Sequence, residues 1–293
     1  MSMPTVRVKA PAKINLSLDI LGKRHDGYHF MKMVMQTVEL SDTLIVTEEK
    51  TPGIRVTCSD SRVPCDGRNL AFRAAEAFLK AEGLAGKGVS VHIQKRIPME
   101  AGMAGGSADA AGTLVGLNRL FGRGRTPEQL CETGLSLGAD VPFCLLGGTQ
   151  LSEGIGEIFT PLPSLPDCRI LVAKPEIGIK TRDSFAKFDA IVPSRVPDTD
   201  AMVAAVASGN LSAVAGEMVN VFEEVTDLPE VFMLKEAMRS YGALGSLMTG
   251  TGTAVFGLFD DLRLARRCAR ALYGKAGAVF LTRPDPLGAR VEG

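Results

Sequence analysis

The chain of 293 residues lacks any excess of charge, because its 33 Lys and Arg residues are matched by 33 Asp and Glu residues. Proteins that bind nucleic acid normally carry a basic surface stripe, so this balance argues against a nucleic-acid partner. Histidine is scarce, and none of the six cysteines forms a C-x-x-C pair, so we expect no structural zinc site. We expect the cysteines to be free, small, buried side chains, which fits a reducing compartment.

Long apolar runs are also missing. The first residues, MSMPTVRVKAPAK, contain no apolar signal-peptide segment, and no run approaches the ~20 residues needed to cross a bilayer. We therefore expect a cytoplasmic protein with no membrane partner. At roughly 150 residues per domain, the length predicts two domains.

The chain mixes strand and helix patterns. Residues 5–21 alternate between apolar and polar side chains, which predicts a strand with one buried face, interrupted at Pro11. Further strands are expected at 31–40 and in short pieces over 145–160. Helices are expected at 68–84, 126–138, 198–217, 229–241 and 262–274. The proline-rich segment 161–167 is the best candidate for a domain boundary, and the C-terminal half, without strict strand–helix alternation, indicates an α+β fold.

A glycine-rich segment, IPMEAGMAGGSADAAGTL, occupies residues 97–114. It is not a Walker A loop, because no Lys-Ser or Lys-Thr follows its glycines, and it does not match G-x-G-x-x-G. Gly102, Gly105 and Gly106 would let backbone N–H groups approach a phosphate at the start of a helix, where Ser107 can cap the helix or meet a magnesium ion. From these residues alone, phosphate binding and tight packing of a helix against a sheet are equally open interpretations.

Three other features raise the same question. Lys13 and Asn15 share the polar face of the first strand, where such side chains are usually solvated. Asp140 stands between Gly-Ala and Val-Pro-Phe, where an acid either caps nearby backbone or takes part in catalysis. The second glycine segment, GSLMTGTGTAVFGLFD at 245–260, is either a turn before a strand or a second anion cradle.

Together these segments resemble the GHMP kinase superfamily. PMEAGMAGGS is similar to its P-x-x-x-G-x-x-G-G-S loop. PAKINLSLDILGKRHDGYH and GADVPFCLLGGTQLSEGIGE are similar to segments of the kinases that act on 4-diphosphocytidyl-2-C-methyl-D-erythritol. The resemblance implies a two-domain α+β fold. An ATP-binding α/β domain, similar to a ribosomal protein domain, would span 1–163, and a ferredoxin-like substrate-side α+β domain would span 164–293.

The resemblance also implies a reaction, the transfer of the ATP γ-phosphoryl group to the 2-hydroxyl of the erythritol unit in isoprenoid precursor biosynthesis. Asp140 would be the general base, and Lys13 would stabilise charge on the transferred group. ATP and Mg²⁺ are the implied cofactors, with no protein ligand assigned to the metal. The implied partner is the small cytidine diphosphate-linked substrate, and the protein would be a monomer or a homodimer.

The resemblance assigns binding roles residue by residue. The implied nucleotide-binding residues are Asn69, Leu70, Lys95, Pro98, Gly102, Gly105, Gly106 and Ser107. The implied substrate-binding residues are Asn15, Tyr28, His29, Thr181, Phe185, Gly250, Thr251 and Gly252. Within the second set, Tyr28 and Phe185 would stack on cytosine, and His29 would read its edge. The ordinary alternatives are that Phe185 is a core residue, that His29 is a residue of a turn and that Lys95 is a solvated charge at a strand end.

The glycine loop departs from the superfamily pattern at three positions, Glu100, Ala104 and Ala108, and the last removes a common serine. Other functions therefore stay open. The chain can be another small-alcohol kinase of the superfamily, a non-catalytic nucleotide-binding or RNA-associated module, or an enzyme similar to mevalonate diphosphate decarboxylase.

Overall fold

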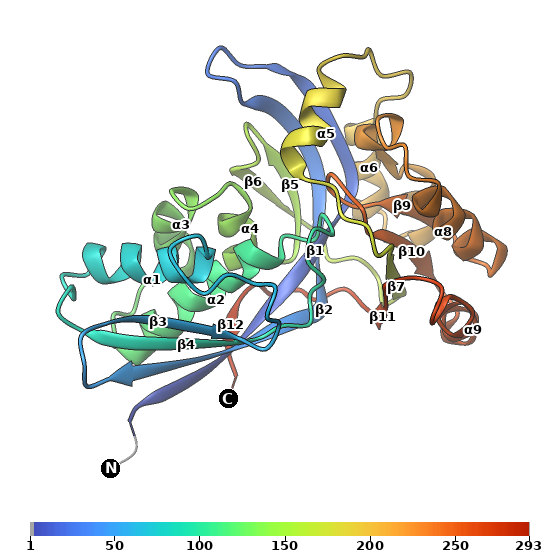
Figure 1. The fold of residues 1–293 in the computed structure, drawn as a ribbon. Coiled ribbons are helices and arrows are strands. Elements are labelled where there is room, and N and C mark those ends of the chain that lie inside the picture. The colour runs from blue at the N-terminus through green and yellow to red at the C-terminus, as the bar shows by residue number, and fades with distance from the viewer. Residues whose placement is uncertain (1–2, 293) are drawn as a thin grey trace.

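The structure is a computed structural model that describes residues 3–292. Strands and helices are mixed, which confirms the expected α+β class, and two sheets form the framework (Figure 1). Within the described residues the larger sheet has eight strands, in the order β12-β1-β2-β4-β3, with β8 added on β1 and the pair β5–β6 on β2. Its strands are β1 (Thr5–Lys23), β2 (His29–Glu49), β3 (Gly53–Cys58), β4 (Gly88–Gln94), β5 (Thr149–Glu153), β6 (Ile158–Leu162), β8 (Val219–Asn220) and β12 (Arg290–Val291).

The smaller sheet is antiparallel, with the order β11-β7-β10-β9. Its strands are β7 (Arg169–Lys174), β9 (Gly245–Met248), β10 (Val255–Phe259) and β11 (Ala278–Thr282). Two helices, α8 (Pro229–Ser240) and α9 (Leu262–Leu272), pack on this sheet and on each other (Figure 1). This four-stranded layer with its helices matches the α+β architecture expected of the C-terminal half.

Four helices gather beside the larger sheet. They are α1 (Leu70–Ala81), α2 (Gly105–Leu120), α3 (Pro127–Leu135) and α4 (Asp140–Leu146). The sequence begins α3 with a capping box between Thr126 and Gln129 and with Pro127 at its first position. Asn69 caps α1, as its amide oxygen accepts a hydrogen bond from the backbone of Ala71. The remaining helices are α5 (Thr181–Phe188), α6 (Thr199–Ala207), α7 (Leu211–Gly216) and a 3₁₀ turn at Val221–Glu224.

The first strand is buried on both faces, whereas the alternating pattern predicts one. Ile14 and Leu16 belong to the apolar core, but Lys13 is only 5% exposed and Asn15 is fully buried. The cause is long-range, because β8 pairs with β1 and the turn after β9 packs on Asn15. The interruption predicted at Pro11 is confirmed as a shift in the β1–β2 register between Pro11 and Lys13.

Residues 145–160 also differ from the expectation of short strands alone. The structure places Leu145 and Leu146 at the end of α4, and only 149–153 and 158–162 form strands. The expectation that all six cysteines are buried is wrong for Cys65, which is exposed, and for Cys58 and Cys131, which are half-buried. All six are free thiols, as expected.

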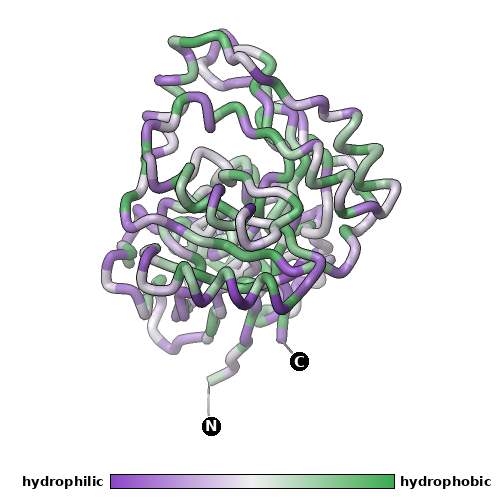
Figure 2. Tube along the Cα trace, turned by 90° about the vertical axis from the view of Figure 1, so that its right-hand side faces the viewer, coloured by the Kyte–Doolittle hydropathy of each residue, from purple (hydrophilic) through white to green (hydrophobic). Residues whose placement is uncertain are grey.

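Both ends of the described chain lie at the same end of the molecule (Figures 1 and 2). Val8 in β1 pairs with Val291 in β12, so the last residues add a strand beside the first. The segment 161–167 connects β6 to β7, and a boundary at 163/164 stays a prediction. Within residues 3–292, no helix combines the length and the apolar character that crossing a bilayer requires.

Candidate active site

One cavity of about 760 Å³ brings most of the expected site residues together. The expected residues that line it are Lys13, Tyr28, His29, Asn69, Leu70, Lys95, Pro98, Gly102, Gly105, Gly106, Ser107, Asp140, Thr181, Phe185, Gly250 and Thr251. These come from β1, the turn between β1 and β2, β2, the start of α1, the residue after β4, the glycine loop, α4, α5 and the turn after β9. Segments far apart in sequence therefore meet here. Asn15 and Gly252 are not among its lining residues.

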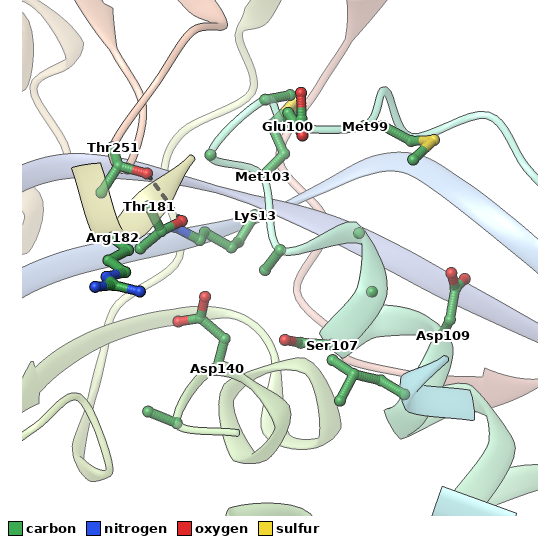
Figure 3. Close-up of a pocket in the computed structure, with 18 of the residues that line it drawn as sticks. Lys13, Met99, Glu100, Met103, Ser107, Asp109, Asp140, Thr181, Arg182 and Thr251 are labelled. Atoms are coloured by element: carbon green, nitrogen blue, oxygen red, sulfur yellow. Dashed lines mark hydrogen bonds between the residues drawn. The ribbon is translucent and has the colours of Figure 1, made fainter. Parts of the chain in front are cut away.

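Lys13 and Asp140 face this cavity from opposite elements. Lys13 projects from the middle of β1, and Asp140 is the first residue of α4, with its carboxylate pointing into the same space (Figure 3). The Ser107 hydroxyl at the start of α2 also points toward this space. Within residues 3–292, no ion pair or hydrogen bond engages the carboxylate of Asp140 or the hydroxyl of Ser107. Both groups are therefore available to a bound molecule.

Asn15 supports the site from behind rather than lining it. Its amide oxygen accepts hydrogen bonds from the Lys13 Nζ (2.6 Å) and from the Gly250 backbone N–H (3.0 Å). Asn15 therefore orients the lysine and fastens the second glycine turn. Asn15 is fully buried, its oxygen is already engaged, and its Nδ2 lies 3.4 Å from the Met33 sulfur. The expected contact between Asn15 and the sugar alcohol stays a prediction.

The glycine loop and the turn after β9 lie back to back. Gly102 has a φ of +70°, and a Cβ atom there would come within 2.0 Å of the Thr249 carbonyl oxygen. Gly250 has a φ of +56°, and its Cβ would lie 2.7 Å from the Gly102 oxygen. Only glycine meets both demands, the left-handed backbone and the close approach. The expected anion cradles at 97–114 and 245–260 are thus two walls of one cavity.

Lys95 sits in a buried cluster of charges rather than at a solvated strand end. Its Nζ lies 2.6 Å from both Asp42 and Asp109, and its side chain is 7% exposed. Burial raises the pKa of Asp109 well above its ordinary value, while the two carboxylates outweigh burial and raise the pKa of Lys95. Lys95 is therefore charged, and its charge is satisfied within the protein. The cluster supports Gly105, whose added Cβ would lie 3.2 Å from Nζ.

The side chain of Asn69 is similarly engaged. Its oxygen caps α1, and its Nδ2 donates a hydrogen bond to the Pro64 carbonyl at 2.7 Å. Asn69 therefore holds the 64–70 turn that, with Leu70, forms one wall of the cavity.

The far end of the cavity is aromatic. The Phe185 ring in α5 stacks on His29 at 4.7 Å between centroids, with 27° between the planes, and meets Phe222 edge-on at 4.9 Å. Tyr28, in the turn between β1 and β2, is 60% exposed. Thr181 lies 3.3 Å from Thr251, oxygen to oxygen, which joins α5 to the turn after β9 (Figure 3).

Comparison with known proteins decides the family. The profile of the GHMP kinases N terminal domain matches residues 69–148, and that of the GHMP kinases C terminal domain matches residues 202–278. A 4-diphosphocytidyl-2-C-methyl-D-erythritol kinase of Caldicellulosiruptor saccharolyticus is 46% identical over 266 residues, which cover 89% of this chain and 91% of the relative. The chain belongs to the GHMP kinase family.

Other relatives agree. A protein of Clostridium novyi with the same name is 44% identical, covering 94% of this chain and 98% of its own. A crystal structure of 4-(cytidine 5'-diphospho)-2C-methyl-D-erythritol kinase superposes with a TM-score of 0.79 at 33% identity, over 95% of this chain and 98% of that one. The homoserine kinase of Cytophaga hutchinsonii also reaches 0.79, over 100% and 99% of the two chains, but at 20% identity it shares the fold alone. GHMP kinases are ATP-dependent phosphotransferases, so the expectation of a kinase that uses ATP is confirmed.

The three departures of this GHMP kinase from the family loop differ in their structural consequences. Ala104, where a glycine is common, takes a left-handed φ of +57° immediately before α2, and Glu100 has a φ of +50°. Non-glycine residues adopt this region at a cost, so the loop is held by its surroundings rather than by its own preference. Ala108 is fully buried in the core, and its methyl side chain offers no hydroxyl where a serine is common.

Sequence reasoning overlooked Arg182. It is exposed, lines the cavity beside Thr181, and directs its guanidinium toward the space in front of Asp140 (Figure 3). The signal was present in the motif KTRDSF, where Arg182 directly follows the expected Thr181. Among residues 3–292 there is no group of three or more His, Cys, Asp or Glu side chains that could hold a metal.

Proposed function

We propose that this GHMP kinase transfers the γ-phosphoryl group of ATP to the 2-hydroxyl of 4-diphosphocytidyl-2-C-methyl-D-erythritol. The observation that carries the proposal is the single cavity in which the glycine loop, Lys13, Asp140 and an aromatic end meet. Such a cavity has a place for a triphosphate, a charged centre for transfer and a surface for a nucleobase. The names of the relatives, at 44–46% identity over most of both chains, support the same substrate.

The transfer depends on alignment and on charge. Loop N–H groups and the start of α2 would bind the triphosphate, since free backbone donors and the helix dipole favour anions. Asp140 would accept the proton of the attacking hydroxyl, because its carboxylate has no other partner among the described residues. Lys13, held by Asn15 at 2.6 Å, would stabilise the charge on the transferred group. Arg182 would add positive charge on the substrate side of the same space.

Mg²⁺ is also part of the proposal. The residue that would hold it with the phosphates is Ser107, whose hydroxyl oxygen faces the cavity and is a hard ligand of the kind that Mg²⁺ prefers. The ion would supply neutralisation of phosphate charge. Since the metal usually takes few protein ligands and several phosphate oxygens, the lack of a dense carboxylate cluster within residues 3–292 is compatible with it.

The aromatic end would take the cytidine. Tyr28 offers an exposed ring and Phe185 a second one, and His29, which stacks on Phe185, would meet the edge of the base. A stacking contact contributes about 1–3 kcal/mol per base. The diphosphate would then lie along the turn at Gly250 and Thr251, between the base and the transfer centre.

A coupled assay of ADP release tests the proposal. The enzyme is supplied with ATP, Mg²⁺ and one acceptor at a time: the cytidyl substrate, homoserine, mevalonate or mevalonate diphosphate. ADP release with the cytidyl substrate alone is the expected outcome. Release with homoserine or mevalonate instead would assign the protein to another small-alcohol kinase, release of CO₂ from mevalonate diphosphate would indicate a decarboxylase, and no release with any substrate would contradict the proposal.

A further inference from the structure

His29 is held by a residue at the end of α5. It is the first residue of β2, its side chain is 8% exposed, and its Nε2 lies 2.7 Å from the Asp189 Oδ1. Asp189 is the residue that ends α5, and its second oxygen lies 2.5 Å from the Lys23 Nζ. The contact thus joins the β1–β2 hairpin to α5, the helix that carries Phe185.

Asp189 remains a carboxylate in this setting. The hydrogen bonds from Lys23 and then His29 lower its pKa below the ordinary value. A carboxylate only accepts hydrogen bonds, so Nε2 of His29 must be the protonated nitrogen. In the neutral ring the other nitrogen, Nδ1, then carries a lone pair. No hydrogen bond within residues 3–292 engages Nδ1.

Cytosine and uracil differ in the group that they would present to Nδ1 of His29. His29 lines the cavity, with one ring face against Phe185. Cytosine carries an exocyclic amine, a donor, at the position where uracil carries a carbonyl oxygen, an acceptor. A nitrogen that can only accept matches the amine and repels the oxygen. A site with a fixed buried acceptor rejects a ligand that cannot pair with it.

We propose that Asp189 is the positioning residue that sets base specificity: it fixes His29 with Nδ1 as an acceptor, so that the cavity prefers cytidine to uridine nucleotides. The inference rests on the proposed function, because it takes the aromatic end as the nucleobase site. It adds a residue, outside the cavity lining, that decides which base is accepted.

The test compares the dissociation constants of CDP and UDP, measured by calorimetry, in the wild-type protein and in Asp189→Ala. The expected result is that Asp189→Ala lowers the preference for CDP over UDP by about tenfold, the effect of losing one specific hydrogen bond. For the cytidyl substrate KM should rise by a similar factor, while kcat stays within about threefold, since the transfer centre is untouched.

The control is Asp227→Ala. Asp227 pairs with Lys187 of α5 at 2.5 Å, so this variant removes another anchor of the same helix without touching His29. It should keep the wild-type preference. Nitrogen-15 NMR of His29 should report a proton on Nε2 and none on Nδ1 in the wild type, and a mixture in Asp189→Ala.

Four results would overturn the inference: an unchanged CDP preference in Asp189→Ala, an equal loss in Asp227→Ala, a wild-type His29 protonated on Nδ1, or equal binding of CDP and UDP by the wild-type protein. Failure of the proposed function looks different, because then the wild-type protein would release no ADP with the cytidyl substrate. If the wild-type enzyme turns over that substrate but binds CDP and UDP equally, the function stands and the role of Asp189 falls.

Discussion

At the scale of single residues, two lysines of one cavity have different surroundings. The Nζ of Lys13 has one neutral partner, the amide oxygen of Asn15, whereas Lys95 lies between two carboxylates. A buried charge that is satisfied within the protein offers little to a ligand, and its removal leaves its partners buried without compensation. Lys13 is therefore the lysine whose charge is available to a phosphate, and Lys95 shapes the wall beneath the glycine loop.

Replacing Lys95 tests this distinction. Lys95→Met leaves Asp42 and Asp109 buried without their cation, and we expect it to lower the free energy of unfolding by about 3–5 kcal/mol. Urea unfolding measures the change. The matched control is Lys87→Met, because Lys87 forms an exposed pair with Glu48 that should contribute about 0–1 kcal/mol. Equal small losses in both variants would mean that the Lys95 cluster is not structural.

Asp140 allows a test of the reaction itself. We expect Asp140→Asn to lower kcat by about 10²–10⁴-fold, because the amide cannot accept the hydroxyl proton. The KM for ATP should change little, since the loop holds the triphosphate. Steady-state ADP release measures both. Asp167→Asn, which removes an exposed partner of Arg169, is the control, and unchanged turnover in Asp140→Asn would favour a non-catalytic protein.

At the scale of elements, the site depends on two glycine turns in contact. Their backbones approach so closely that Gly102 and Gly250 leave no room for a side chain, and the Ala254 N–H donates a hydrogen bond to the Ala101 carbonyl. One turn follows β4 and the other links β9 to β10. The two walls of the cavity are therefore joined by direct backbone contact.

A pair of variants separates backbone strain from crowding. Gly124 has a φ of +64° with no atom near its absent Cβ, so Gly124→Ala should cost only the left-handed strain, roughly 1–2 kcal/mol. Gly102→Ala has the same strain plus a clash with Thr249, and we expect an additional loss of about 1–3 kcal/mol and a raised KM for ATP. Thermal unfolding and ADP release measure these effects. Equal costs for the two variants would show that the turns can separate freely.

The sequence predicts elements well where the signal is local. Thr126, Pro127 and Gln129 predict the start of α3, and alternation predicts β1, because caps and periodicity depend on neighbours in the chain. The sequence does not predict α4, because glycines flank it and Pro142 lies within it. Proline is tolerated in the first turn of a helix, where Pro142 lies.

Site residues are predictable only in part, for the same reason. The motifs locate Lys13, Ser107 and Asp140 in one cavity. They do not reveal that Lys95 is neutralised by an acid 53 positions away, or that Asn15 binds a turn 235 positions away, because these partners come from the tertiary fold.

At the scale of the whole molecule, the end of the chain is fastened to its beginning. Asp285, which is 3% exposed, receives hydrogen bonds from Lys9 in β1 at 3.0 Å and from Arg290 in β12 at 2.7 Å. Burial raises the pKa of Asp285, but the hydrogen bonds from Arg290 and Lys9 outweigh it and lower the net value below 3.8. The larger sheet is thus completed by residues from both ends.

This pKa shift predicts a pH dependence of stability. Because the folded protein holds the Asp285 proton less tightly than the unfolded chain, the stabilisation is present above pH ~4 and is lost as the pH falls through the folded pKa. Asp285→Asn should therefore lower the free energy of unfolding by about 1–3 kcal/mol at pH 7, and the difference should shrink near pH 3. Urea unfolding at both pH values measures it, and a difference that grows in acid would contradict the assignment.

The pairing of Val8 with Val291 also has a consequence for biosynthesis. The ribosome synthesises β1 long before β12, so until β12 follows, one edge of the nascent sheet near Val8 has no neighbour. Unpaired edges are where growing chains associate wrongly. Protection of this stretch by a chaperone, or by slow early folding, would therefore matter most before Val291 emerges.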